Sequence, residues 1–424
     1  MTIMVIVFFC LVVIKTPIGF SLLISSLVYF LRDGTIPLTI IAQKMISGPN
    51  AYALLAVPLF ILSGNFMNVG GITTRIFRFA RVLIGHVPGG LGQVNILASV
   101  IFSGMSGSAN ADAAGLGLIE INAMREAGYD EDYSIGVTSA SSIIGPIIPP
   151  SVPAVLYAMV SSVSLGKLFV AGIIPGFVMA LCIGIMAFMI AMKRGYKASQ
   201  RATFKEILTA FIKAFPSLLT PVIIITGLWS GMFTATEVAA VTLIYALFLS
   251  TLVYKDLRLK DIPQVLYNSA YLSIPFIFIV ATSMVFGWII IREQAGQQLG
   301  NFILALTSNK YVILLILNIV LLILGTFMDP AVTILLLVPV LKPLLTTVQI
   351  DLLHFGIVMI LNLMIGLLTP PVGSVLNTLT TVADIPMEMV IKATMKFLLP
   401  LIISLLLITF IPQLVLFLPN LLFK

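Results

Sequence analysis

The sequence predicts an all-α polytopic membrane protein. Of the 424 residues, 60% are hydrophobic and only 9% are charged, whereas a soluble domain carries about 25% charged residues. The mean hydropathy is +1.16. Apolar runs of about 20 residues recur along the whole chain, each long enough to cross a bilayer. A membrane β-barrel would instead show alternation in segments of about ten residues.

We expect membrane helices in the longer apolar runs, which fall near 3–31, 51–68, 89–104, 168–192, 214–230, 235–253, 269–291, 311–328 and 396–419. Shorter runs, interrupted by Gly and Pro, fill 132–163 and 330–382. Between 72 and 84, three arginines are spaced by three residues and so share one helical face. This pattern favours an arm helix lying in the membrane interface over an ordinary basic loop.

The net charge of +7 arises in short loops and does not indicate nucleic-acid binding. Bases gather at 193–205 and 255–260, and the sequence 214–253 between them holds two apolar runs, enough for two crossings. Both loops then lie on one side of the membrane, which the positive-inside rule makes cytoplasmic. Cys10 and Cys182 lie in apolar segments and imply neither a disulfide framework nor a metal site.

Two pairs of polar breaks indicate an internal repeat. The first half contains "SGSANAD", ending at Asp112, and then "GPIIPPSVP"; the second contains "GTFMDP", with Asp329, and then "GLLTPPVGS". From each aspartate to the first proline of the next Pro-Pro pair the distances are 37 and 41 residues. In both halves a glycine precedes that proline by four residues.

A basic cytoplasmic linker at 193–206 divides the chain into a first repeat, 1–192, and a second repeat, 207–424. The polar breaks fall in 100–165 of the first and 320–385 of the second. An odd number of crossings in each half would invert the second repeat relative to the first.

The breaks predict the binding site of a secondary transporter. Interrupted backbone at membrane depth survives only where it is buried in protein or lines a wet cavity, and broken helices paired across a repeat mark such sites. Free N–H groups at half-helix N-termini suit a substrate carboxylate. Unwound carbonyls and hydroxyl or amide oxygens suit a hard cation such as Na⁺.

We interpret "SGSANAD" as the tip of a re-entrant hairpin, in which Ser106 and Ser108 offer hydroxyls and Asn110 offers an amide. A tight crossing of small-residue helices is the alternative. Asp112 and Asp329 are acids within apolar sequence and are therefore functional candidates.

Simpler roles compete at several of these positions. The aspartate of "GTFMDP" equally suits the N-cap of the helix that follows. Glu237 suits a first-turn partner of the helix dipole, and His86 and His354 suit the ends of membrane segments. No nucleophilic triad, metal cluster or Walker-type motif is present, so we expect neither an enzyme nor ATP hydrolysis by this chain.

The sequence resembles one transporter family almost from end to end. The segments that carry the likeness are "VPLFILSGNFMNVGGIT", "SGSANADAAG", "IIPPSVPAVLY", "LFVAGIIPG", "SGMFTATEVAAV", "GTFMDP", "HFGIVMILNLMIGLLTPPVGSVLN" and "ITFIPQL". They resemble the large membrane subunit (DctM type) of tripartite ATP-independent periplasmic (TRAP) transporters.

The resemblance implies a multi-pass permease of the bacterial cytoplasmic (inner) membrane that takes up organic acids by Na⁺ symport. It implies an elevator fold, in which a scaffold holds still while a transport domain with two re-entrant hairpins carries the substrate. A separate small four-helix membrane subunit and a periplasmic substrate-binding protein would be its partners. "PVGSVLN" resembles members that carry sugar acids, sialic acid included, more than C4-dicarboxylate members.

The resemblance also implies which residues form the sites. The substrate carboxylate would meet Ser106 and Ser151, with Asp329 near the substrate or a sodium ion. Sodium oxygens would come from two sets, which are Ser106, Asn110, Gly145 and Pro149 in the first half and Gly325, Thr369, Pro370 and Gly373 in the second. Asn110 departs from the family pattern, which more often has another residue there, and could tune ion or substrate binding.

Three other functions compete with this one. A stand-alone Na⁺/carboxylate symporter would show similar repeats and hairpins and would need no binding protein. An intramembrane enzyme would need a nucleophile–base pair or a metal cluster at depth. A purely structural subunit would have no reason to place matched polar breaks in both halves.

Overall fold

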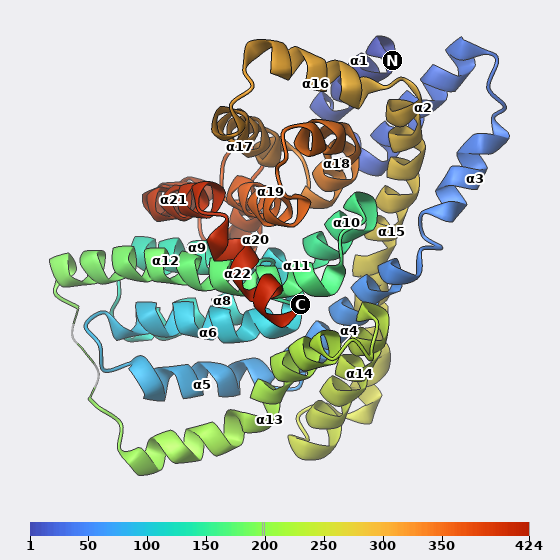
Figure 1. The fold of residues 1–424 in the computed structure, drawn as a ribbon. Helices are drawn as coiled ribbons and strands as arrows, with labels where there is room; N and C mark the ends of the chain where they lie inside the picture. The colour runs from blue at the N-terminus through green and yellow to red at the C-terminus, as the bar shows by residue number, and fades with distance from the viewer. Residues whose placement is uncertain (197, 199, 424) are drawn as a thin grey trace.

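The computed structural model describes residues 1–196, 198 and 200–423, and regular structure within these residues is entirely helical (Figure 1). Eight helical segments are long and apolar enough to cross a membrane: Tyr52–Val69, Leu165–Arg194, Phe204–Trp229, Ala235–Val253, Leu259–Arg292, Lys310–Phe327, Pro330–Thr347 and Met387–Phe410. The prediction of an all-α polytopic membrane protein is confirmed at this level.

The helices up to the basic linker are α1 (Thr2–Val13), α2 (Ile18–Asp33), α3 (Thr39–Ser47), η1 (Tyr52–Leu55), α4 (Ala56–Val69), α5 (Ile72–Ile84), α6 (Gly90–Ser106), α7 (Ala109–Ala114), α8 (Leu116–Glu126), α9 (Glu131–Ser142), α10 (Val152–Ser161), α11 (Leu165–Ala171) and α12 (Ile173–Arg194). Lys197 and Ser199 of the predicted linker lie outside the described residues.

The helices after the linker are α13 (Phe204–Trp229), α14 (Ala235–Phe248), η2 (Leu249–Val253), η3 (Leu259–Asp261), α15 (Ile262–Arg292), α16 (Ala295–Leu306), α17 (Lys310–Phe327), α18 (Pro330–Thr347), α19 (Leu352–Gly366), α20 (Ser374–Ala383), α21 (Met387–Phe410) and α22 (Gln413–Leu422). Between the two predicted basic loops, α13 and the continuous segment of α14 and η2 supply the two expected membrane-length helices.

Several predicted apolar runs contain more than one helix, and two of them, 3–31 and 396–419, are divided at or next to a proline. The run 3–31 divides into α1 and α2, because Lys15 adopts a positive φ of 63° and Pro17 precedes the first residue of α2. The run 396–419 divides into α21 and α22 at Pro412. A proline has no N–H to continue the helical ladder, so both breaks follow from local sequence.

The arm predicted at 72–84 is the helix α5, which packs between α6 and α13 (Figure 1). It buries Ile72, Ile76 and Ala80 and leaves Arg78 and Arg81 exposed. The helix is confirmed, whereas its position in the membrane interface stays a prediction. The long helix α15 runs along another side of the molecule and contacts α2, α3, α4 and α18.

The polar breaks of each half contact one another. In the first half, α6 ends, the chain turns at Gly107 with a φ of +62°, and α7 and α8 return against α6. The broken segment between α9 and α10 lies at this turn, where the Val152 N–H donates to the Gly107 carbonyl at 3.5 Å. In the second half, the Val372 N–H donates to the Thr326 carbonyl at 3.4 Å. The turn of one helix pair therefore meets the break of the next in both halves.

Glycines make these contacts possible. A Cβ added at Gly107 would lie 2.5 Å from the Pro150 carbonyl oxygen, and one added at Gly366 would lie 2.6 Å from the Cα of Gly325. Real Cβ atoms do not approach backbone so closely, so α17 and α19 touch backbone to backbone at this point.

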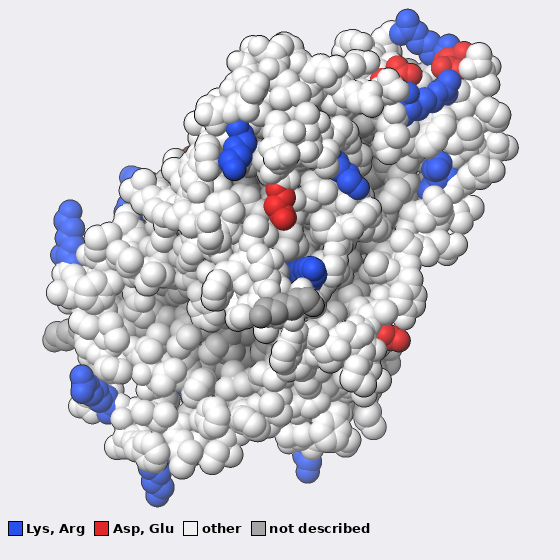
Figure 2. All heavy atoms as spheres, in the orientation of Figure 1, with Lys and Arg blue, Asp and Glu red and all other residues white. Residues whose placement is uncertain are grey.

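Charged side chains are few and scattered on the face shown in Figure 2. One ion-pair network ties three helices together: Arg194, at the end of α12, lies 2.7 Å from both Asp130 and Asp132, and Lys396 of α21 lies 2.6 Å from Asp132. Hydrogen bonding from Arg194 holds the pKa of Asp132 well below its usual range. Part of the predicted linker charge is thus already neutralised inside the fold.

Gly366→Ala should destabilise the protein by about 1–3 kcal/mol or more, because its methyl group meets rigid backbone. Gly287→Ala in α15 is the matched control, since no atom of the described residues lies within 4 Å of its added Cβ. There the loss of glycine flexibility should stabilise by about 0.5–1 kcal/mol. Thermal unfolding of both variants in detergent measures the difference, and equal melting temperatures would contradict the backbone contact.

Candidate functional site

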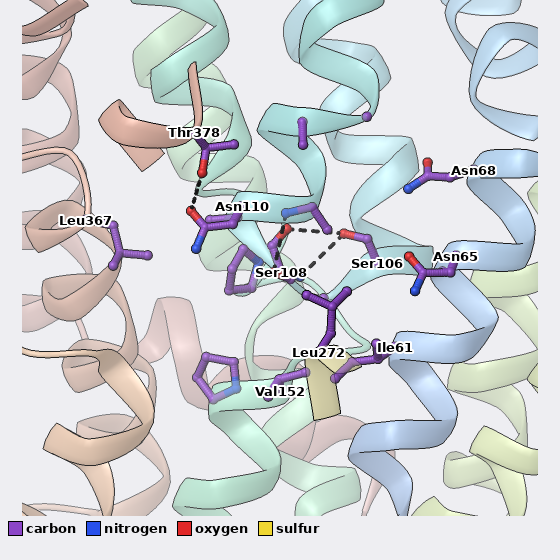
Figure 3. A pocket seen from close by; sticks show the side chains of 18 of the residues that line it. Ile61, Asn65, Asn68, Ser106, Ser108, Asn110, Val152, Leu272, Leu367 and Thr378 are labelled. Atoms are coloured by element: carbon purple, nitrogen blue, oxygen red, sulfur yellow. Dashed lines mark hydrogen bonds between the residues drawn. The ribbon is translucent and has the colours of Figure 1, made fainter. Parts of the chain in front are cut away.

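A cavity of about 680 Å³ lies where the first hairpin turn faces α4 and α15 (Figure 3). Its walls come from α4, α5, α10, α15 and the turn, with contributions from the start of α18 and the breaks of both halves. The lining residues are Ile61, Gly64, Asn65, Asn68, Thr73, Thr74, Ser106, Gly107, Ser108, Ala109, Asn110, Ala111, Ala114, Gly115, Ile119, Pro146, Val152, Pro153, Leu156, Leu272, Phe276, Asp329, Pro330, Ala331, Met364, Leu367 and Thr378.

The hairpin turn is built by local capping. Ser108 is extended and caps α7, accepting from the Ala111 N–H at 3.4 Å. The Ser106 hydroxyl donates to the Asp112 carboxylate and accepts from the Ser108 N–H at 3.4 Å. Asp112 is 2% exposed, and its other carboxylate oxygen lies against Gly145 without a hydrogen-bond partner among the described residues. Asp112 therefore lies behind the turn, and Ser106 separates it from the cavity.

Asn110 connects the two halves. Its amide nitrogen donates to Ser374 Oγ at 3.3 Å, and its amide oxygen accepts from the Thr378 hydroxyl at 3.4 Å (Figure 3). Ser374 and Thr378 belong to α20, which follows the second Pro-Pro break. The side chain that departs from the family pattern thus bridges the first turn and the second broken helix.

Asp329 has both of the roles considered for it. It is the N-cap of α18, where its Oδ1 accepts from the Ala331 N–H at 2.8 Å. Its side chain is also exposed to the cavity that it lines. A carboxylate at a helix N-terminus is stabilised by the positive end of the helix dipole, so it can keep its charge there.

The remaining first-half candidates lie behind the cavity wall. Ser151 caps α10, accepting from the Ala154 N–H at 3.2 Å, and its hydroxyl donates to the Pro146 carbonyl. Ser151 is 1% exposed, while its neighbours Val152 and Pro153 face the cavity. Gly145 and Pro149 are buried in the same broken segment. To bind a carboxylate, the Ser151 hydroxyl must turn away from Pro146.

The second-half candidates form a separate group at the other break. Gly325 packs against Gly366, and the Thr369 hydroxyl donates to the Ile365 carbonyl at 3.0 Å. Gly373 has a φ of +44° and precedes α20. These residues and Pro370 are not among the residues that line the cavity. The structure therefore brings Ser106, Asn110 and Asp329 to one cavity and leaves the second sodium set around a different break.

Buried asparagines hold each broken helix against its hairpin. Asn95 of α6 accepts from the Ser141 hydroxyl at 2.6 Å, and Asn318 of α17 accepts from the Asn362 amide at 2.8 Å. Asn95 precedes Ser106 by 11 residues, as Asn318 precedes Asp329. Hydrogen-bonded polar pairs in an apolar interior fix the relative position of two helices, although the Asn362 amide oxygen has no partner among the described residues.

Sequence reasoning missed the wall opposite the hairpin. Asn65 and Asn68 of α4 face the turn in Figure 3. Asn65 donates to Ser269 at 2.7 Å, and the Asn68 amide oxygen accepts from Thr73 at 2.9 Å, which leaves the Asn68 amide nitrogen without a partner among the described residues. Two amides three residues apart on an apolar helix were the available signal.

Other candidates have structural roles. Glu237 forms a capping box with Thr234, accepting from its N–H at 2.7 Å, so the dipole-partner interpretation is confirmed. His86 lies in the turn after α5. His354 lies in the first turn of α19, at a helix end as expected, but it is 2% exposed and its ring bonds to the Ile408 carbonyl at 2.9 Å. The described residues contain no cluster of metal-ligating side chains.

The chain matches the family model for the DctM component of the tripartite ATP-independent periplasmic transporter over residues 5–414. It is 48% identical over 409 residues to the sialic acid TRAP transporter large permease protein SiaM of Vibrio cholerae, covering 96% of this chain and 95% of that protein. It is 39% identical over 380 residues to the C4-dicarboxylate TRAP transporter large permease protein DctM of Pseudomonas aeruginosa, covering 90% and 89%.

A match to the sialic acid TRAP transporter permease protein SiaT of Haemophilus influenzae has 42% identity and covers 96% of this chain but 66% of that protein. Among solved structures, the YdaH transporter of Alcanivorax borkumensis has the same fold, with a TM-score of 0.64 at 12% identity over 88% of this chain and 87% of that one. The resemblance drawn from the sequence motifs is confirmed, and the chain belongs to the DctM family of TRAP transporter large permeases.

Proposed function

We propose that this chain is the ion-translocating subunit of a Na⁺-coupled uptake system for organic acids. The identity of 48% to a sialic acid permease favours a sugar acid over a C4-dicarboxylate, whose named relative is 39% identical. The relatives are transporter permeases, which fits the expectation that the chain is not an enzyme.

The charge of the cavity is the observation that carries the proposal. Among the described residues that line it there is no lysine, arginine or histidine, and Asp329 is the one acid. An organic anion would therefore meet neutral amides and hydroxyls beside a carboxylate, without any protein cation to balance it. Cations that bind with the substrate supply that balance, and the chain's unwound carbonyls suit Na⁺.

In this proposal the two breaks hold the ions. The Ser106 hydroxyl donates to Asp112 and accepts one long hydrogen bond from the Ser108 N–H, so an oxygen lone pair remains for a cation. Asn110, Gly145 and Pro149 complete the first set, and the second set gathers around the Gly325–Gly366 contact with Thr369, Pro370 and Gly373. Asp329 and the Asn68 amide nitrogen would face the substrate, and Ser151 would join them once its hydroxyl turns away from the Pro146 carbonyl.

The membrane assignments complete the proposal. The hairpins would be re-entrant elements of two inverted repeats and would move together as an elevator against α4 and α15. The protein would reside in the bacterial inner membrane, with 193–205 and 255–260 cytoplasmic. A small four-helix membrane subunit and a periplasmic binding protein would be its partners, as the names of TRAP relatives support.

Reconstitution tests the function directly. The chain and its small membrane partner are placed in proteoliposomes with binding proteins loaded with sialic acid or a C4-dicarboxylate, under an inward Na⁺ gradient. We expect uptake only with both the gradient and the sialic acid-loaded protein. Uptake of free substrate without a binding protein would instead establish the stand-alone symporter.

Ser106→Ala should raise the Na⁺ concentration for half-maximal uptake roughly tenfold, because an ion ligand is lost and Asp112 loses its hydrogen bond. Ser151→Ala should weaken uptake mainly through the substrate. Ser161→Ala on α10 is the control, since this buried hydroxyl donates to the Tyr157 carbonyl at 2.6 Å and accepts from the Val163 N–H at 3.4 Å, and Ser161 does not line the cavity. Unchanged uptake and Na⁺ dependence in both test variants would remove these two serines from the sites.

Asp329→Asn should abolish coupled uptake while leaving thermal stability nearly unchanged, because asparagine caps a helix as well as aspartate does. Asp329→Ala should lose about 1 kcal/mol of stability as well. Uptake and melting temperature are measured on both variants. If the asparagine variant transports with normal Na⁺ dependence, Asp329 serves only as the cap of α18.

A further inference from the structure

A second hollow region lies between α5 and the first half of α13 and shares Thr74 with the lining of the substrate cavity. One cavity of about 710 Å³ is lined by both helices and by residues 200–202, and an adjoining cavity of about 550 Å³ continues toward Asp256. The two share Thr74, Arg78, Ala210 and Lys213, so they form one cleft. We call this the α5–α13 cleft.

The cleft is strongly cationic. Its basic lining residues are Arg75, Arg78, Arg81, Arg201, Lys205 and Lys213. Of the two acids, Asp256 pairs with Arg75 at 2.6 Å, and Glu206 is engaged in the capping box of α13 with Thr203. The other five bases are exposed and have no carboxylate partner within the described part of the chain. Their mutual repulsion across the cleft favours a bound anion.

An apolar strip runs beside these charges. Leu208, Phe211, Ile212 and Phe215 are exposed on α13. The Phe211 ring lies 5.8 Å from that of Phe79 on α5 and 5.5 Å from that of Phe215, so the strip continues across both helices. A small soluble anion would make no contact with this apolar strip, whereas the acyl chains of a lipid would pack against it.

We propose that the α5–α13 cleft binds an anionic glycerophospholipid, with its phosphate among Arg78, Arg81 and Lys213 and its acyl chains along the Phe211 strip. Basic pockets between helices of membrane proteins hold such headgroups, and each nearby Lys or Arg adds about 1 kcal/mol of attraction. The bound lipid neutralises the facing bases and holds α5 against α13. Without the lipid, α5 would contact α13 mainly through the apolar residues at the edge of the cleft.

Lipid binding to the purified full-length chain tests the site. Delipidated protein is titrated with phosphatidylglycerol, and bound lipid is counted by native mass spectrometry. The double variant Arg78→Gln/Lys213→Gln should bind the tightest phosphatidylglycerol roughly 30-fold more weakly. The control double variant Lys167→Gln/Lys310→Gln removes two exposed bases elsewhere and should bind like the unchanged protein. Melting temperatures confirm that all variants are folded.

Further measurements distinguish a bound lipid from a soluble anion. Glycerol phosphate should not compete at millimolar concentration, and phosphatidylcholine should not replace phosphatidylglycerol. Phe211→Ser should weaken phosphatidylglycerol binding although it removes no charge. Equal binding by the test and control double variants would overturn the proposal. Full competition by glycerol phosphate, with no effect of Phe211→Ser, would replace the lipid by a soluble phosphate.

Discussion

The contact between the turn of one helix pair and the break of the next is the constraint on which the rest of the structure depends. Backbone groups that leave a helix inside a membrane protein must find partners within the protein. Here the partners come from the facing element, through Val152 to Gly107 and Val372 to Thr326. Glycine at the contact points lets the backbones meet, and the asparagine pairs further along α6 and α17 keep the helices in register.

This arrangement explains the chemistry of the cavity. The hydroxyl protons of Ser106, at the turn, and Ser151, in the broken segment, are already donated to neighbouring groups. These residues therefore offer a ligand oxygen acceptors more readily than O–H donors. Amides on α4 supply donors from the opposite wall. In the proposed function, an organic anion would bind between the turn, which suits cations, and the α4 wall, which supplies hydrogen-bond donors.

The helical class and the positions of the polar breaks could be predicted from the sequence. Gly, Pro and polar residues within apolar runs interrupt helices through local effects, which do not depend on the rest of the fold. Sequence analysis did not predict the split of 3–31, although its local cause, the Lys15-Thr16-Pro17 step, can be read in the sequence. It also missed Asn65 and Asn68, whose importance depends on which helix packs opposite the hairpin. The helix-end position of His354 was predicted, but its burial against α21 was not, because position in an apolar run does not reveal which helix packs there.

The hydrogen bonds of Asn110 have a consequence for release. At 3.3 and 3.4 Å they are long, so in the proposed function a ligand that bound this amide would replace weak hydrogen bonds with new ones at little cost. The reverse exchange would occur when the ligand leaves, because the Asn110 amide can again form its hydrogen bonds with Ser374 and Thr378. A carrier must release its ligand on every cycle. If the amide always has a hydrogen-bond partner, the free-energy changes of ligand binding and of ligand release both stay small.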